Sequence, residues 1–125
     1  MTDIFANSSD CAELLHAPKE ELMKVTELKD AERVPIQLDA RKMCVRQEVE
    51  LIHLNFGPGE MLEKHANPFD VIFYVLEGSG ELEIEEEKRQ IGKDSTIEVQ
   101  ANLMRGWKNN GEGNLRILVI KVLNK

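Results

Sequence analysis

The stretch from His65 to Glu81, "HANPFDVIFYVLEGSGE", is the part of the sequence that decides the fold. It joins a polar opening to the apolar run "VIFYVL" and then to the glycine-rich turn "EGSGE". Apolar and aromatic residues bounded by glycine are typical of a β-strand that enters a hairpin. Because "VIFYVL" is apolar at every position, we expect a strand that is covered on both faces.

Short runs of the same kind recur after Val34, with turn-forming clusters between them. The runs are "VPIQL", "MCVRQEVELIHLNF", "GELEIEEEKRQIG", "STIEVQA", "LMRGWKNN" and "LRILVIKVL", and the clusters include "FGPGE", "IGKDS" and "NNGEGN". In "GELEIEEE", apolar and acidic residues alternate, which indicates a strand with one buried face. Several short strands separated by turns predict an all-β sandwich or barrel over residues 34–125.

Helical signals are confined to residues 8–33. "SSDCAELL" offers candidate N-cap residues, and Pro18 in "APKEELMKV" suits the first turn of a helix. We therefore predict a short, partly helical N-terminal arm over residues 1–33, packed on the β domain.

The composition argues against several classes of function. The chain has 125 residues, enough for one domain, and a formal net charge of −7, which argues against nucleic-acid binding and against an anionic membrane surface. The sequence has neither the features of a signal peptide nor an apolar run that would span a bilayer, so we expect a cytoplasmic protein. Cys11 and Cys44 are outside any C-x-x-C pair; we expect two free thiols, with a Cys11–Cys44 disulfide as the alternative.

The spacing around the opening stretch resembles the first motif of the cupin family. That motif is Gly, five residues, His-x-His, three or four residues, Glu, six residues and Gly. Here the order is Gly59, "EMLEK", "HAN" (65–67), "PFD", Val71, "IFYVLE" and Gly78. A more degenerate second motif follows as Gly92, "KDSTIEVQANLM", Arg105, "GWK" and Asn109.

The resemblance covers roughly residues 43–122 and implies a double-stranded β-helix, the cupin jelly-roll barrel. Small cupins similar to this chain are commonly homodimers that exchange arm strands. The resemblance therefore implies a homodimer, with "VPIQL" and the residues before it at the interface.

Cupin metal sites take two His and one Glu from the first motif and one His from the second. Of these positions the sequence keeps only His65; the others are Asn67, Val71 and Arg105. Val71 offers no ligand atom, and the fixed positive charge of Arg105 repels a divalent cation. We expect no metal cofactor. A divalent transition metal with His65 as one ligand is the alternative.

The same positions suggest an anion pocket. His65 and Asn67, two apart on a strand, would share the face that the resemblance places inside the barrel, with Arg105 and Trp107 opposite them. Arginine binds carboxylates and phosphates, and tryptophan supplies an apolar wall. His53, in "ELIHLNF", is a further candidate, but both faces of that run are apolar.

These residues predict a pocket that binds a small anionic organic ligand. The alternatives are a metal-free isomerase, epimerase or lyase with His65 as base, and a metal-dependent dioxygenase or isomerase with non-standard ligands. A fourth hypothesis is a structural or interaction role, in which the barrel edge and the N-terminal arm form an assembly surface. The simplest alternative for the pocket is that His65, Arg105 and Trp107 only pack or form pairs within the barrel.

Overall fold

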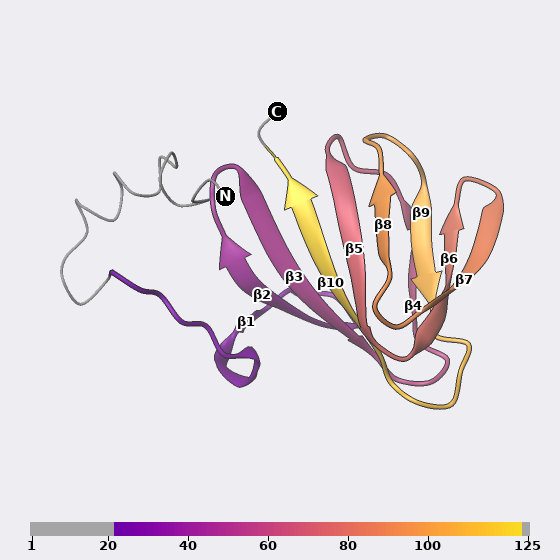
Figure 1. Cartoon of the computed structure of the whole chain (residues 1–125), viewed down its shortest axis with the longest axis horizontal. Coiled ribbons are helices and arrows are strands. Elements are labelled where there is room, and N and C mark those ends of the chain that lie inside the picture. The colour runs from indigo at the N-terminus through magenta and orange to yellow at the C-terminus, as the bar shows by residue number, and fades with distance from the viewer. Residues whose placement is uncertain (1–21, 124–125) are drawn as a thin grey trace, which may run out of the picture.

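Two antiparallel β-sheets face each other in the computed structural model, which describes residues 22–123 (Figure 1). One sheet has the strand order β1-β2-β3-β10-β5-β8 and the other β4-β9-β6-β7. The strands are β1 (Glu32–Arg33), β2 (Asp39–Val45), β3 (Val49–Phe56), β4 (Met61–His65), β5 (Asp70–Glu77), β6 (Ser79–Ile84), β7 (Glu87–Gly92), β8 (Thr96–Val99), β9 (Arg105–Lys108) and β10 (Leu115–Val122). The all-β prediction is confirmed.

The structure describes only the last part of the predicted N-terminal arm (1–33). The residues that carry the helical signals "SSDCAELL", Pro18 and Cys11 lie outside the described residues. After Leu22 the chain forms one 3-10 turn, η2 (Leu28–Asp30), and then β1, which pairs with β2 in the six-stranded sheet.

Cys44, on β2, forms no disulfide among the described residues. Between residues 22 and 123 there is no helix of a length and hydrophobicity suited to crossing a lipid bilayer.

Two strand assignments from the sequence are wrong. The run "VPIQL" (34–38) is a bend and not a strand, because Pro35 has no N–H to donate and the Ile36 N–H turns back to the Val34 carbonyl at 2.8 Å. The run "MCVRQEVELIHLNF" is two strands, β2 and β3, joined by a turn in which the Arg46 N–H bonds the Val49 carbonyl at 2.9 Å.

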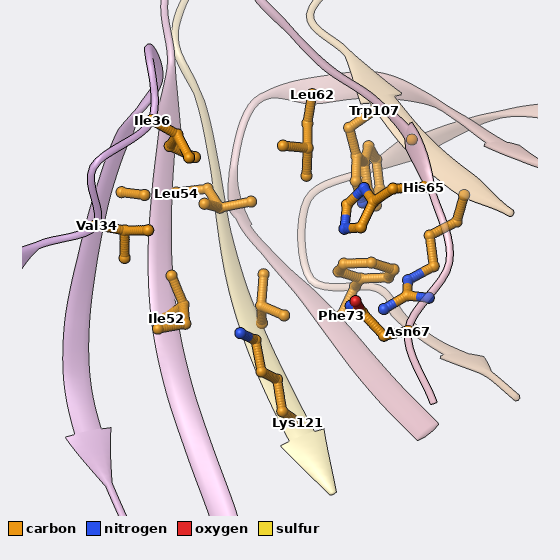
Figure 2. Close-up of a pocket in the computed structure, with 14 residues that line it drawn as sticks. Val34, Ile36, Ile52, Leu54, Leu62, His65, Asn67, Phe73, Trp107 and Lys121 are labelled. Atoms are coloured by element: carbon orange, nitrogen blue, oxygen red, sulfur yellow. The ribbon is translucent and has the colours of Figure 1, made fainter. Parts of the chain in front are cut away.

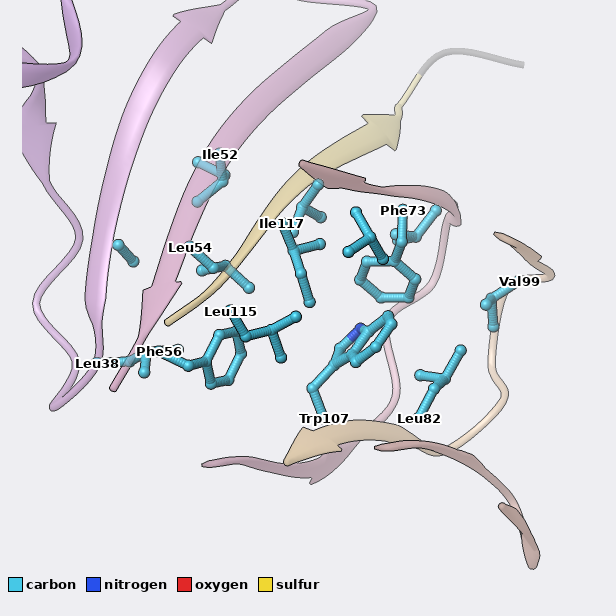
Figure 3. Packing of buried hydrophobic residues seen from close by; sticks show 14 residues of the cluster. Leu38, Ile52, Leu54, Phe56, Phe73, Leu82, Val99, Trp107, Leu115 and Ile117 are labelled. Atoms are coloured by element: carbon cyan, nitrogen blue, oxygen red, sulfur yellow. The ribbon is translucent and has the colours of Figure 1, made fainter. Parts of the chain in front are cut away.

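The hydrophobic core packs between the two sheets (Figure 3). Inward residues alternate along the strands, so that β5 buries Val71, Phe73 and Val75 and β10 buries Leu115 and Ile117. Ile72, Tyr74 and Leu76 remain half-buried on the opposite face of β5. The expected cover on both faces of "VIFYVL" is therefore wrong: only the inner face is fully buried.

Asn109 joins the loops at one end of the barrel. Its side-chain amide donates to the carbonyls of Phe56 at 3.0 Å and Gly113 at 2.8 Å, and its oxygen accepts from the Gly111 N–H at 3.1 Å. Asn109 is 1% exposed, and its bond to the Phe56 carbonyl is fully buried. The asparagine of the second motif therefore has a structural role here.

Candidate functional site

A cavity of about 290 Å³ opens between the sheets (Figure 2). This volume is near the lower limit of ordinary small-molecule pockets. Figure 2 shows His65, Asn67, Phe73 and Trp107 across the cavity from Val34, Ile36, Ile52 and Leu54. The complete lining is Val34, Ile36, Ala40, Ile52, Leu54, Leu62, His65, Asn67, Phe73, Arg105, Gly106, Trp107, Val119 and Lys121.

Strand β9 carries two of the residues that the sequence singled out. Arg105 lies between Ile84 of β6 and His65 of β4 in the sheet register, and Trp107 lies between Leu82 and Leu62 in the next inward row. The Trp107 ring meets Phe73 edge-on, with centroids 5.5 Å apart and planes at 84°. The expected meeting of Arg105, Trp107 and His65 at one cavity is what the structure shows.

Arg105 is 3% exposed, and none of the ion pairs among residues 22–123 includes it. Its Nη1 donates to the Leu103 carbonyl at 3.4 Å. Burial lowers the pKa of its guanidinium group from the ordinary value, but an arginine remains protonated near neutral pH. Within residues 22–123, therefore, no carboxylate balances this buried positive charge at the pocket.

Asn67 is in the loop between β4 and β5, because β4 ends at His65. The expectation that His65 and Asn67 share a strand is therefore wrong, although both line the cavity. With the amide oriented by its hydrogen-bond partners, the Asn67 side-chain oxygen accepts from Arg105 Nη2 at 2.5 Å and its nitrogen donates to the Ala66 carbonyl at 3.1 Å. A neutral amide thus orients the guanidinium group without cancelling its charge.

The turn before β9 holds this loop in place. The Asn102 N–H donates to the Asn67 carbonyl at 2.8 Å, and the Ala101 N–H donates to the Asp70 carboxylate at 2.9 Å. Asn102 has φ 70°, a left-handed conformation that asparagine tolerates better than most residues. On the other side, the Glu85 carboxylate accepts from the Met104 N–H at 2.7 Å, directly before Arg105. The sequence analysis missed the parts played by Asn102 and Glu85.

His65 is exposed at the rim of the cavity. Its Nδ1 lies 3.0 Å from the Glu63 carbonyl oxygen. A carbonyl oxygen only accepts hydrogen bonds, so this contact assigns the proton of the neutral ring to Nδ1. Nε2 is then an acceptor, available to a ligand or to a proton.

Lys121 is a second cation at the pocket, and the sequence analysis missed it. Its Nζ lies 3.0 Å from the Glu50 carboxylate and 5.8 Å from the centre of the Phe69 ring. The alternation of β10 would have indicated it, because Lys121 is two residues from the inward-facing Val119. Its charge is balanced by Glu50, unlike that of Arg105.

His53 does not line this cavity. Ile52, Leu54 and Phe56 are the inward residues of β3, so His53 faces the outer side of the sheet, where its Nε2 accepts from Arg116 Nε at 3.0 Å. Burial and, to a lesser extent, the charge of Arg116 lower the pKa of His53, while Asp39 opposes the shift.

The residues at the usual cupin metal positions do not fit a divalent metal. His65 and Asn67 offer one nitrogen and one amide, Val71 is a buried hydrocarbon side chain, and Arg105 is a cation. In the part of the chain from 22 to 123, no three His, Cys, Asp or Glu side chains come together as a metal-binding group.

Comparison with known proteins decides the family. The family model described as "Cupin domain" matches residues 52–121. The chain belongs to the cupin family. Among curated proteins, no sequence matches this cupin.

Solved structures show the same double-stranded β-helix. The polyketide cyclase RemF from Streptomyces resistomycificus superimposes with a TM-score of 0.72 at 18% identity, over 82% of this chain and 80% of that one. KdgF from Halomonas sp. gives 0.65 at 21% identity, over 77% and 88%. An RmlC-like cupin from Methanocaldococcus jannaschii gives 0.69 at 22% identity, over 81% and 91%. Identities this low show the fold of this cupin and not its ligand, and the predicted cupin barrel is confirmed.

Proposed function

We propose that this cupin binds a small organic anion in the cavity between its sheets, without a metal ion. The observation that carries the proposal is the buried guanidinium group of Arg105, which has no carboxylate partner among residues 22–123. An isolated buried charge is unfavourable, and a bound anion with two oxygens would balance it and accept two parallel hydrogen bonds.

The surroundings of Arg105 support this proposal. Asn67 holds the guanidinium group from one side, and His65 lies beside Arg105 in the register of the four-stranded sheet. In many cupins a metal ion provides the positive charge at this place, whereas here a protein side chain provides it. With Arg105 in place of the metal ion, the pocket still suits an anionic ligand.

Titration of small organic anions tests the proposal directly. Trp107 is the only tryptophan of the chain and lines the cavity, so its fluorescence reports binding without a label. We expect carboxylates to change the emission of the wild-type protein and to have no effect on Arg105→Met. Arg89→Met, on the exposed edge strand β7, is the matched control and should bind like the wild type. An emission unchanged by every anion would overturn the proposal.

The metal-free part of the proposal has a separate test. Protein purified without chelator or metal-affinity tag is soaked with iron, nickel, zinc or manganese, desalted and submitted to elemental analysis. We expect far less than one metal ion per chain, because the donor set at the pocket is too poor. A near-stoichiometric metal content that His65→Ala abolishes would overturn this part and favour a metal-dependent reaction.

A second candidate function is metal-free proton transfer, as in an isomerase, epimerase or lyase. The contact between His65 Nδ1 and the Glu63 carbonyl favours it, because it leaves Nε2 unprotonated at the rim of the pocket. The charge of Arg105 would stabilise the enolate formed when a proton leaves the carbon next to a carboxylate. Exchange of that proton for deuterium in D₂O is the assay. Exchange that survives in His65→Ala would exclude this mechanism.

A further inference from the structure

The charges and walls of the cavity also indicate the class of anion, an inference that rests on the proposed function. We infer that the ligand is a monocarboxylate with an apolar body. We expect dicarboxylates and phosphate esters to bind less tightly than such a monocarboxylate.

The number of negative charges follows from the two cations that line the cavity. Arg105 has no acidic partner among residues 22–123, whereas Lys121 lies 3.0 Å from the Glu50 carboxylate. One positive charge is therefore left for a ligand. A second negative charge would have to compete with Glu50 for Lys121, because Arg105 and Lys121 are the only Arg and Lys side chains that the described residues contribute to the lining.

The apolar body follows from the wall of the cavity that faces His65 and Asn67. Figure 2 shows Val34, Ile36, Ile52 and Leu54 on this wall, and the Phe73 ring adds apolar surface across the cavity from them. Hydrocarbon surfaces favour a ligand that displaces water from them. A polar body such as that of a sugar acid would leave its hydroxyl groups without partners along this wall.

Calorimetric titration of matched probes tests the class. The parent probe is 4-phenylbutanoate, compared with its amide, with succinate and with phenyl phosphate. We expect the acid to bind about tenfold or more tightly than the amide, the factor expected from one charge-assisted hydrogen bond. We also expect the acid to bind more tightly than succinate and phenyl phosphate.

The outcomes separate this inference from the proposed function. If succinate or phenyl phosphate binds as tightly as the acid and Arg105→Met abolishes the binding, the anion pocket stands and the monocarboxylate class is wrong. If the amide binds as tightly as the acid, or if no anion binds, the proposed function itself is wrong.

One variant tests the charge count. Glu50→Gln frees the charge of Lys121, so it should strengthen the binding of succinate and phenyl phosphate relative to the wild type. An unchanged preference would contradict the charge count.

Discussion

Arg105 holds a buried positive charge beside the cavity. We expect this charge to contribute little to the stability of the ligand-free protein, because desolvation of the guanidinium group opposes its hydrogen bonds to Leu103 and Asn67.

Arg105→Met should leave the free energy of unfolding of the ligand-free protein within about 1 kcal/mol of the wild type. Methionine fills much of the same volume, and removal of the buried charge offsets the loss of two hydrogen bonds. Urea unfolding measures the difference. A loss of about 3 kcal/mol or more would identify Arg105 as a structural residue and weaken the case for an anion site.

His53 predicts a dependence of stability on pH. Burial lowers its pKa in the folded protein, so between that pKa and the unfolded value of 6.5 the unfolded chain binds more protons. Stability should therefore fall as the pH drops below 6.5. The slope from this one group is at most about 1.4 kcal/mol per pH unit.

Unfolding of the wild type and His53→Gln at pH 7.5 and 5.5 isolates this contribution, because glutamine can accept from Arg116 but does not titrate. The variant should lose less stability on acidification. Asp39 and Arg116 are the charged groups that influence His53, and both are retained in the comparison. Equal losses in the two proteins would show that His53 is not the titrating group.

At the scale of the strand, Gly106 allows β9 to lie against β4. A Cβ atom added at this position would be 2.6 Å from the Leu62 carbonyl oxygen and 2.9 Å from the Lys64 nitrogen. Both are backbone atoms of a paired strand and have little freedom to move. Since Arg105 and Trp107 flank this glycine, the close pairing of the two strands also positions the pocket.

Gly106→Ala should destabilise the protein by about 1–3 kcal/mol, the usual cost of overpacking, and should weaken anion binding. Gly113→Ala is the control, because its added Cβ would meet no atom within 4 Å; its effect should be within about 0.5 kcal/mol. Thermal unfolding with and without 4-phenylbutanoate measures both effects. Equal stability of the two variants would show that β4 can move away.

The sequence predicted most strands because their alternation and turn residues are local signals. The strand predicted at His65 exists as β4, but it ends at His65 and does not reach Asn67. The strand predicted at "VPIQL" is absent, because Pro35 prevents it. In the site, Arg105 and Trp107 were predicted from motif positions. Lys121, Glu50 and Asn102 were not, because their roles depend on contacts between segments far apart in the sequence.

At the scale of the whole molecule, the expected homodimer stays a prediction. Light scattering of the full chain should give twice the monomer mass. The chain without residues 1–21 retains every described strand. A change in its mass in solution would therefore report the role of the arm and not loss of the fold. A monomer mass for the shortened chain and a dimer for the full chain would support arm exchange. A monomer mass for both would contradict the dimer.

Strand β10 pairs with β3 on one side and with β5 on the other, although it follows all the other described strands in the sequence (Figure 1). On the ribosome, β3 and β5 therefore emerge long before the strand that joins them. Until Leu115–Val122 is available, the centre of the larger sheet is open and its strand edges are exposed to aggregation. The barrel is thus completed late, through contacts between distant parts of the sequence, which is the topology of a slow folder.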